Sequence, residues 1–213
     1  ISCNEDGGRN IVYSVDLHEK NNPKIVNWTP KDFNVRTRVH EYGGGAFFVH
    51  NNVVYFSNMN DQQLYKQDNP DSKPVCITKT KDCFYADGFY STQLSAIYIV
   101  REDHRKLNTS EKDAPSNNSK PEPENVIVRI DPASGEETVV VEGANFYSCP
   151  RVSPDGKRLL WVEWNHPNMP WDNTSIYVAD LDSQTGLILS NTKPTLYAGL
   201  ECIPESKRPD EVS

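Results

Sequence analysis

The chain has 213 residues, a length that fits a single all-β domain. Thirty acidic residues against 22 basic ones give a formal charge of -8, and no stretch gathers the lysine and arginine stripe that nucleic acid or an anionic membrane surface requires. The longest apolar runs are far shorter than the roughly 20 residues that cross a bilayer, so we expect a soluble protein with neither nucleic acid nor membrane as a partner.

Short runs of β-branched and aromatic residues recur along the chain in a fixed order, which is the pattern of short strands. A fragment at residues 11–29 supplies two strands. Three fuller units follow, and each has a tyrosine before a small residue, a strand with an aromatic third residue, a strand that leads into aspartate, and one further strand. The predicted strands after each tyrosine are 53–57, 64–68 and 74–78 in the first unit, 96–100, 127–131 and 137–141 in the second, and 159–163, 176–180 and 194–198 in the third.

The spacing of these units identifies the fold. The runs 53–57, 96–100 and 159–163 start 43 and 63 residues apart, and the larger gap contains the polar stretch 105–125, without which the period is steady. Four antiparallel strands in every forty-odd residues is the period of β-propeller blades. The sequence therefore predicts an all-β fold, a partial β-propeller of about three and a half four-stranded antiparallel blades.

The same pattern predicts the domain organisation. We expect one N-terminal propeller domain over residues 1–213, with blades roughly at 1–34, 35–80, 81–143 and 144–200. Residues 105–125 contain two aliphatic residues and no aromatic one, so they cannot repay the entropy of ordering and we expect a flexible surface insert. Because known propellers close with about four to eight blades, we expect this sequence to stop short of its fold.

No catalytic machinery is predicted within the chain. A serine hydrolase of the α/β type needs a Gly-x-Ser-x-Gly turn to expose its nucleophile, and the sequence has none. Five histidines are scattered, and His40-Glu41 is not followed by the second histidine of a zinc-binding His-Glu-x-x-His motif. We therefore predict no catalytic residue, no metal site and no cofactor.

Residues 35–45, VRTRVHEYGGG, form the first segment of unusual composition. Strand alternation would place Arg36, Arg38 and His40 on one side and Glu41 on the other, until the three glycines loosen the backbone. One interpretation is an arginine–glutamate clamp at the start of a blade. The other is a charged site for the terminus of a peptide.

The second unusual segment is WNHPNMPWD at residues 164–172, where tryptophan, methionine and proline occupy a connection that is ordinarily polar. It could pack against a neighbouring blade, or it could present rigid aromatic side chains to a partner domain or substrate. In an up-and-down blade, the connection into the first strand and the one from the second strand to the third emerge on the same propeller face. We therefore expect both segments on one face, with the candidate binding residues Arg38, Glu41, Trp164, His166, Trp171 and Asp172.

Cysteines and sequons bear on the setting of the protein. Five cysteines without a Cys-x-x-Cys pair favour neither a disulfide framework nor a zinc site, and we expect a reducing, cytoplasmic environment. Four Asn-x-Ser/Thr sequons would be glycosylation acceptors in a secreted protein, but so short a motif also arises by chance. They lie at Asn27, Asn108, Asn117 and Asn173.

Six segments together resemble a known family. They are EDGGR at 5–9, VRTRVHEYGGG at 35–45, YFSN with DQQLY at 55–58 and 61–65, VREDH at 100–104, SPDG at 153–156, and WNHPNMPWD at 164–172. In this order they resemble the propeller of S9 peptidases, the prolyl oligopeptidase family, related to acylaminoacyl peptidase and dipeptidyl aminopeptidases. SPDG is common among propellers, whereas VRTRVHEYGGG with WNHPNMPWD is fairly specific.

The resemblance implies a serine-type peptidase in which a propeller covers a C-terminal α/β-hydrolase domain that carries serine, histidine and aspartate. The present sequence ends before such a domain, so no catalytic residue is carried over. The implied role of this fragment is to restrict access, so that short peptides reach the serine; its partners would be the peptide substrate and the hydrolase domain. The alternative is a stand-alone propeller that binds a protein and has no enzymatic activity.

Overall fold

The computed structural model describes residues 2–3, 8–16, 18, 23–107, 122–199 and 202. Its strands are short and follow one another along the chain. In order they are β1 (Ser2–Cys3), β2 (Arg9–Asn10), β3 (Tyr13–Val15), β4 (Ile25–Asn27), β5 (Phe47–His50), β6 (Val53–Ser57), β7 (Leu64–Gln67), β8 (Val75–Cys76), β9 (Cys83–Ser91), β10 (Ala96–Asp103), β11 (Glu124–Ile130), β12 (Glu137–Val141), β13 (Phe146–Val152), β14 (Arg158–Trp164), β15 (Ser175–Asp180) and β16 (Thr195–Ala198).

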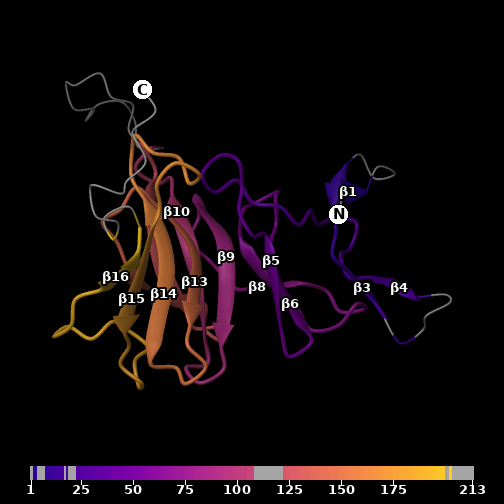
Figure 1. Cartoon of the computed structure of the whole chain (residues 1–213). Coiled ribbons are helices and arrows are strands. Elements are labelled where there is room, and N and C mark those ends of the chain that lie inside the picture. The colour runs from indigo at the N-terminus through magenta and orange to yellow at the C-terminus, as the bar shows by residue number, and fades with distance from the viewer. Residues whose placement is uncertain are drawn as a thin grey trace.

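These strands form three four-stranded antiparallel sheets and two smaller pairs. We name the sheets blade B (β5–β8), blade C (β9–β12) and blade D (β13–β16); each is made of consecutive strands paired in chain order. Strands β3 and β4 form half-blade A, and β1 pairs with β2. In Figure 1 the sheets follow one another from blade D on the left through C and B to half-blade A on the right. The predicted fold class, an all-β partial propeller, is confirmed.

Strand β10 shows why blade C lies at the centre. Successive side chains of a strand point to opposite faces, and nearly all of this strand is buried on both. Tyr98 and Val100 face the core shared with blade D, whereas Ile97 and Ile99 face the core shared with blade B. The continuous apolar run of this strand is therefore the signature of a sheet covered on both sides by neighbouring blades.

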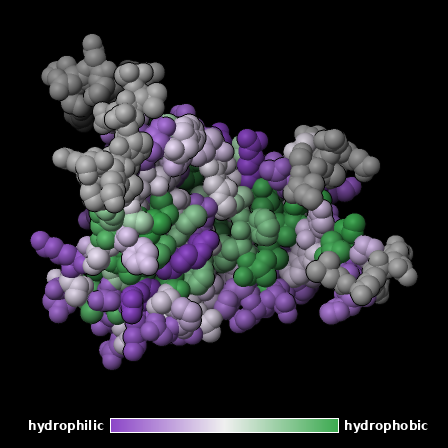
Figure 2. Space-filling view, viewed as in Figure 1, coloured by the Kyte–Doolittle hydropathy of each residue, from purple (hydrophilic) through white to green (hydrophobic). Residues whose placement is uncertain are grey.

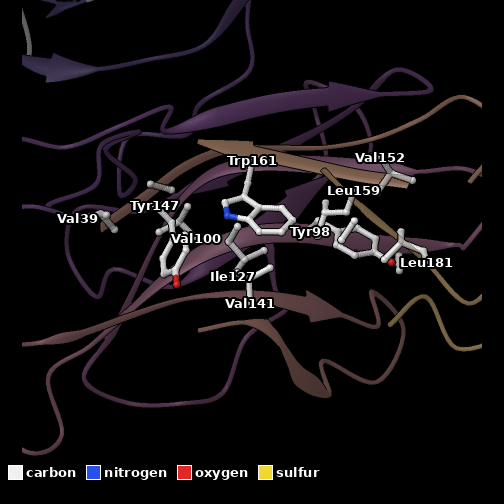
Figure 3. Packing of buried hydrophobic residues seen from close by; sticks show 13 residues of the cluster. Val39, Tyr98, Val100, Ile127, Val141, Tyr147, Val152, Leu159, Trp161 and Leu181 are labelled. Atoms are coloured by element: carbon white, nitrogen blue, oxygen red, sulfur yellow. The ribbon is translucent and has the colours of Figure 1, made fainter. Parts of the chain in front are cut away.

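The core between blades C and D is the larger of these contacts (Figure 3). Trp161 lies in the middle of the cluster, with Tyr147 and Val39 toward one end and Tyr98, Leu159 and Leu181 toward the other. The indole of Trp161 stacks on the ring of Tyr177, with 5.8 Å between centroids, and its Nε1 donates a hydrogen bond to Glu163. Val39 belongs to neither blade, so a segment from outside contributes to this core.

The predicted insert at 105–125 is wrong at its C-terminal end. Strand β11 begins at Glu124, and the side chain of Asn125 is buried and donates a hydrogen bond to the carbonyl of Asn145. The polar composition of these residues concealed the start of a strand, because Asn125 finds its partner in the connection just before the first strand of blade D. At the other end, Arg105 binds the carboxylate of Asp103. Residues 108–121 of the predicted insert lie outside the described residues.

The surface of blade B carries exposed apolar side chains. Phe47 and Val49, which alternate along β5, are both more than half exposed, and Figure 2 shows hydrophobic surface over this strand. The intervening Phe48 and His50 lie on the opposite face of β5, where Phe48 stacks on Tyr55 of β6 in the same blade and His50 stacks on Tyr90 of β9 in blade C. No helix long and apolar enough to cross a membrane occurs in the part of the chain that the structure describes.

Candidate functional site

Residues 35–45, which we call the strap, lead from half-blade A into blade B along an extended path. Val35, Thr37 and Val39 are buried while Arg36 and Arg38 are exposed, as strand alternation predicts. The strap is held by backbone donors: the N–H of Arg36 binds the carbonyl of Ser57, and the N–H of Arg38 binds Gln62 Oε1 at 2.8 Å.

The alternation fails at His40, and here the prediction was wrong. His40 is buried instead of lying on the exposed side with the two arginines. Its φ of 56° and the φ of 66° at Glu41 are left-handed, and the chain turns back so that the N–H of Gly43 reaches the carbonyl of Val39. The turn begins three residues before the glycines that were expected to break the strand.

His40 inserts between blades C and D. Its ring makes edge-on contacts with Phe146 of β13 and Trp164 of β14, both with 5.3 Å between centroids. Its backbone N–H donates to Glu102 Oε2 of β10 at 2.7 Å. Together with the buried Val39, this contact fastens a segment that enters blade B to the two blades that follow it.

Glu102 is a buried carboxylate with two partners. Besides the N–H of His40, it contacts His104, whose Nε2 lies 2.7 Å from Glu102 Oε1. The ring of His104 packs on Phe84, and the guanidinium of Arg38 lies 5.5 Å from the centroid of Phe84 on the strap side. A cation over an aromatic face is a favourable contact, so this row also helps to orient the strap.

The segment 164–172 divides into a buried and an exposed part. Trp164 is 5% exposed and stacks on Phe146 at 5.4 Å, whereas Trp171 is 74% exposed. His166 is exposed, and its Nε2 lies 3.0 Å from Glu122 Oε2. Asp172 is also exposed and accepts the N–H of Met169 at 2.9 Å, which closes the loop locally. Trp164 therefore packs inside the fold, whereas Trp171 lies at the surface.

The structure brings some candidate residues together and leaves others apart. Strap and segment 164–172 meet at His40 and Trp164, so the expectation that both emerge on one face agrees with the geometry. Within the described residues no ion pair joins Glu41 to Arg36 or Arg38, so the clamp interpretation has no support there. Glu41, Arg38, His166, Trp171 and Asp172 face solvent, whereas Trp164 packs between elements of the fold.

Sequence reasoning missed three residues of this site: Glu102, Asn125 and Phe146. Only Glu102 left a signal, since a carboxylate inside a strand of apolar residues needs a buried partner. Within the described ranges no group of three or more histidine, cysteine, aspartate or glutamate residues could hold a metal ion. The exposed side chains of this face can bind by charge and by aromatic contact.

Comparison with solved structures places the fold among known proteins. A Mycobacterium tuberculosis puromycin-hydrolyzing peptidase is 30% identical, with a TM-score of 0.74 over 93% of this chain. A puromycin hydrolase is 21% identical, with a TM-score of 0.65 over 83% of this chain. Regucalcin, a calcium-binding protein from Agrobacterium tumefaciens, is 16% identical with a TM-score of 0.53 over 88% of this chain and shares the fold alone.

The likeness covers part of these proteins. The chain spans 30% of the M. tuberculosis peptidase, 27% of the puromycin hydrolase and 52% of regucalcin. No protein-family model matches the sequence, and no curated protein matches it.

Proposed function

Because the chain is a propeller segment of the S9 peptidase type, we propose that it is the non-catalytic part of a serine-type peptidase and controls which peptides reach a separate catalytic domain. The observation that carries this proposal is the exposed surface formed by the strap and segment 164–172. Trp171 is largely exposed there, and Glu41 has no ion pair among the described residues. Rigid aromatic and charged side chains without a partner are typical of a binding surface.

The division of labour follows from what the chain contains. Its 213 residues have no Gly-x-Ser-x-Gly turn, so the serine, histidine and aspartate of hydrolysis would belong to an α/β-hydrolase domain in the whole protein. A rigid propeller over that domain would exclude folded polypeptides by size and admit short peptides. Its surface charges would then select among the peptides that enter.

Within this proposal Glu41 receives the amino terminus of the peptide. Its carboxylate is exposed beside the exposed ring of Tyr42, and its backbone is fixed because the N–H of Glu41 donates to the carbonyl of Arg38 at 2.9 Å. A fixed carboxylate can form a charge-assisted hydrogen bond with an ammonium group, which is stronger than a bond between neutral groups.

We expect Glu41→Gln in the whole enzyme to raise KM for peptides with a free amino terminus about tenfold, with kcat nearly unchanged, because only a binding contact is lost. Steady-state kinetics with free and amino-blocked peptides measures this. The matched control is Glu136→Gln, since Glu136 is an exposed carboxylate in the β11–β12 turn on the opposite propeller face. Equal KM values for the wild type and Glu41→Gln would remove Glu41 from the substrate site.

The wider proposal has its own test. A fluorophosphonate probe, which labels activated serines, should leave the 213-residue chain unmodified and should label the whole enzyme on a residue outside this chain. Stoichiometric labelling within residues 1–213 would show that the propeller segment is itself catalytic.

A further inference from the structure

His40 is an imidazole enclosed by elements of blades C and D and by the strap itself. It is 9% exposed, and its Nε2 atom is buried without a well-aligned hydrogen bond. The uncharged neighbours are Phe146 of β13, Trp164 of β14 and the amide of Asn125 in β11, whose Oδ1 is likewise buried without a well-aligned donor. The titratable groups that face it are Tyr42 in the strap, Asp87 in β9 and Glu102 in β10, with His104 on the far side of Glu102.

These surroundings suit a neutral ring. Two aromatic rings and an amide supply no countercharge, and moving an imidazolium out of water costs free energy unless a charge is paired with it. The nearest carboxylate, Glu102, already accepts the backbone N–H of His40 and contacts His104. Burial accordingly lowers the pKa of His40 below the ordinary value of 6.5, and the opposing effects of Glu102, Asp87 and the hydrogen-bonding side chain of Asn125 are together smaller.

Protonation of the His40 ring would affect the structure because of where the ring lies. The strap turns at His40, and its left-handed φ, the bond to Glu102 and the two aromatic contacts all depend on the ring remaining between blades C and D. Arg38 and Glu41 stand immediately before and after the buried pair Val39 and His40, and both are exposed. The orientation of the binding surface is therefore set by a buried titratable side chain.

We propose that His40 is a proton-sensitive anchor: when its imidazole takes up a proton, residues 37–43 leave the contact between blades C and D, and Arg38 and Glu41 lose their fixed position. The proposal goes beyond control of peptide access, because it states that the pH decides whether Arg38 and Glu41 hold a fixed position on the binding surface. It stands on the geometry of the strap, and its test involves no peptidase activity.

The direction of the pH effect follows from linkage. Above about pH 6.5 the ring is neutral in the docked and released strap alike, and pH has no influence. Below that value the released strap binds the proton more readily than the docked one. The ratio of released to docked strap should then rise about tenfold for each unit by which the pH falls, until the docked ring is also protonated.

Hydrogen–deuterium exchange measures that ratio directly. We expect the protection factors of the amides of His40 and Gly43, corrected for the intrinsic exchange rate, to fall as the pH drops below about 6.5, by as much as about tenfold per unit, until the docked ring also takes up a proton. Both amides are hydrogen-bonded in the docked strap, to Glu102 and to Val39. The amides of β10 report global unfolding and should keep their protection over the same range.

Two substitutions remove the titrating group in different ways. His40→Phe keeps an aromatic ring between Phe146 and Trp164, and His40→Asn keeps a residue type that tolerates the left-handed backbone. We expect the pH dependence to vanish in both, and His40→Asn decides the matter if His40→Phe does not fold. The matched controls are His104→Gln, on the other side of Glu102, and His166→Gln, whose ring contacts Phe146 from the exposed side.

Both controls should retain the pH dependence of the wild type. A wild-type strap whose protection does not change with pH would overturn the proposal, as would a slope that persists in a folded His40 variant. Loss of the slope in His104→Gln alone would also overturn it, because the proton would then belong to His104.

Discussion

Replacing Trp164 with alanine should lower the free energy of unfolding by about 3–5 kcal/mol, the loss typical of a large buried aromatic side chain. The indole stacks on Phe146 and contacts the ring of His40, so the substitution leaves a cavity where the strap meets blade D. Urea unfolding followed by circular dichroism measures the loss, provided that the slope of the free energy against denaturant is unchanged.

The same chain offers a matched control. Trp171 lies seven residues further on and is 74% exposed, so Trp171→Ala should change the free energy of unfolding by no more than about 0.5 kcal/mol. A similar loss for both variants would mean that Trp171 is covered by a partner in solution. A negligible loss for Trp164→Ala would contradict the packing described for the strap.

Replacing Glu137 with alanine should also destabilise the fold by about 3–5 kcal/mol, because it leaves a buried cation without its partner. The carboxylate of Glu137, 7% exposed, binds Arg101 at 3.0 Å and accepts hydrogen bonds from Tyr85 and Thr80. Arg101 is 13% exposed and cannot turn freely to solvent. Thermal and urea unfolding give the size of the effect.

Glu124 is the control for this second substitution. Its carboxylate also pairs with a cation, Lys106, at 2.7 Å, but this pair lies at the surface, where water solvates each charge after its partner is removed. Glu124→Ala should therefore leave the unfolding midpoint almost unchanged. Equal losses of stability for the two variants would show that burial does not increase the contribution of the Glu137 network.

The strands were predictable because their pattern is local. Residues 53–57 and 137–141 were predicted as strands and form β6 and β12 with those bounds, since β-branched and aromatic runs between turn residues fix a strand without help from the rest of the chain. The strand expected at 74–78 is shorter, and β8 covers only Val75–Cys76. It lies at the outer edge of blade B and pairs on one side only.

The interior of the candidate site was not predictable in the same way. Alternation along the strap was correct as far as Val39 and then placed His40 on the wrong side, because its position is set by Glu102, 62 residues away, and by Phe146 and Trp164 of another blade. Trp164 and Trp171 look alike in the sequence, and only the packing of blade D separates them. Contacts between blades, rather than residue composition, decide which side chains face a partner.

The path of the strap changes how the blades depend on one another during unfolding. In an array in which each repeat touches only its neighbours, stability is close to a sum of nearest-neighbour terms, and end repeats can fray one at a time. Here a segment that enters blade B is packed with Val39 and His40 into the contact between blades C and D. Blade D therefore cannot separate from blade C without also releasing the strap that leads into blade B, so the three sheets should open as one cooperative unit instead of peeling away in order.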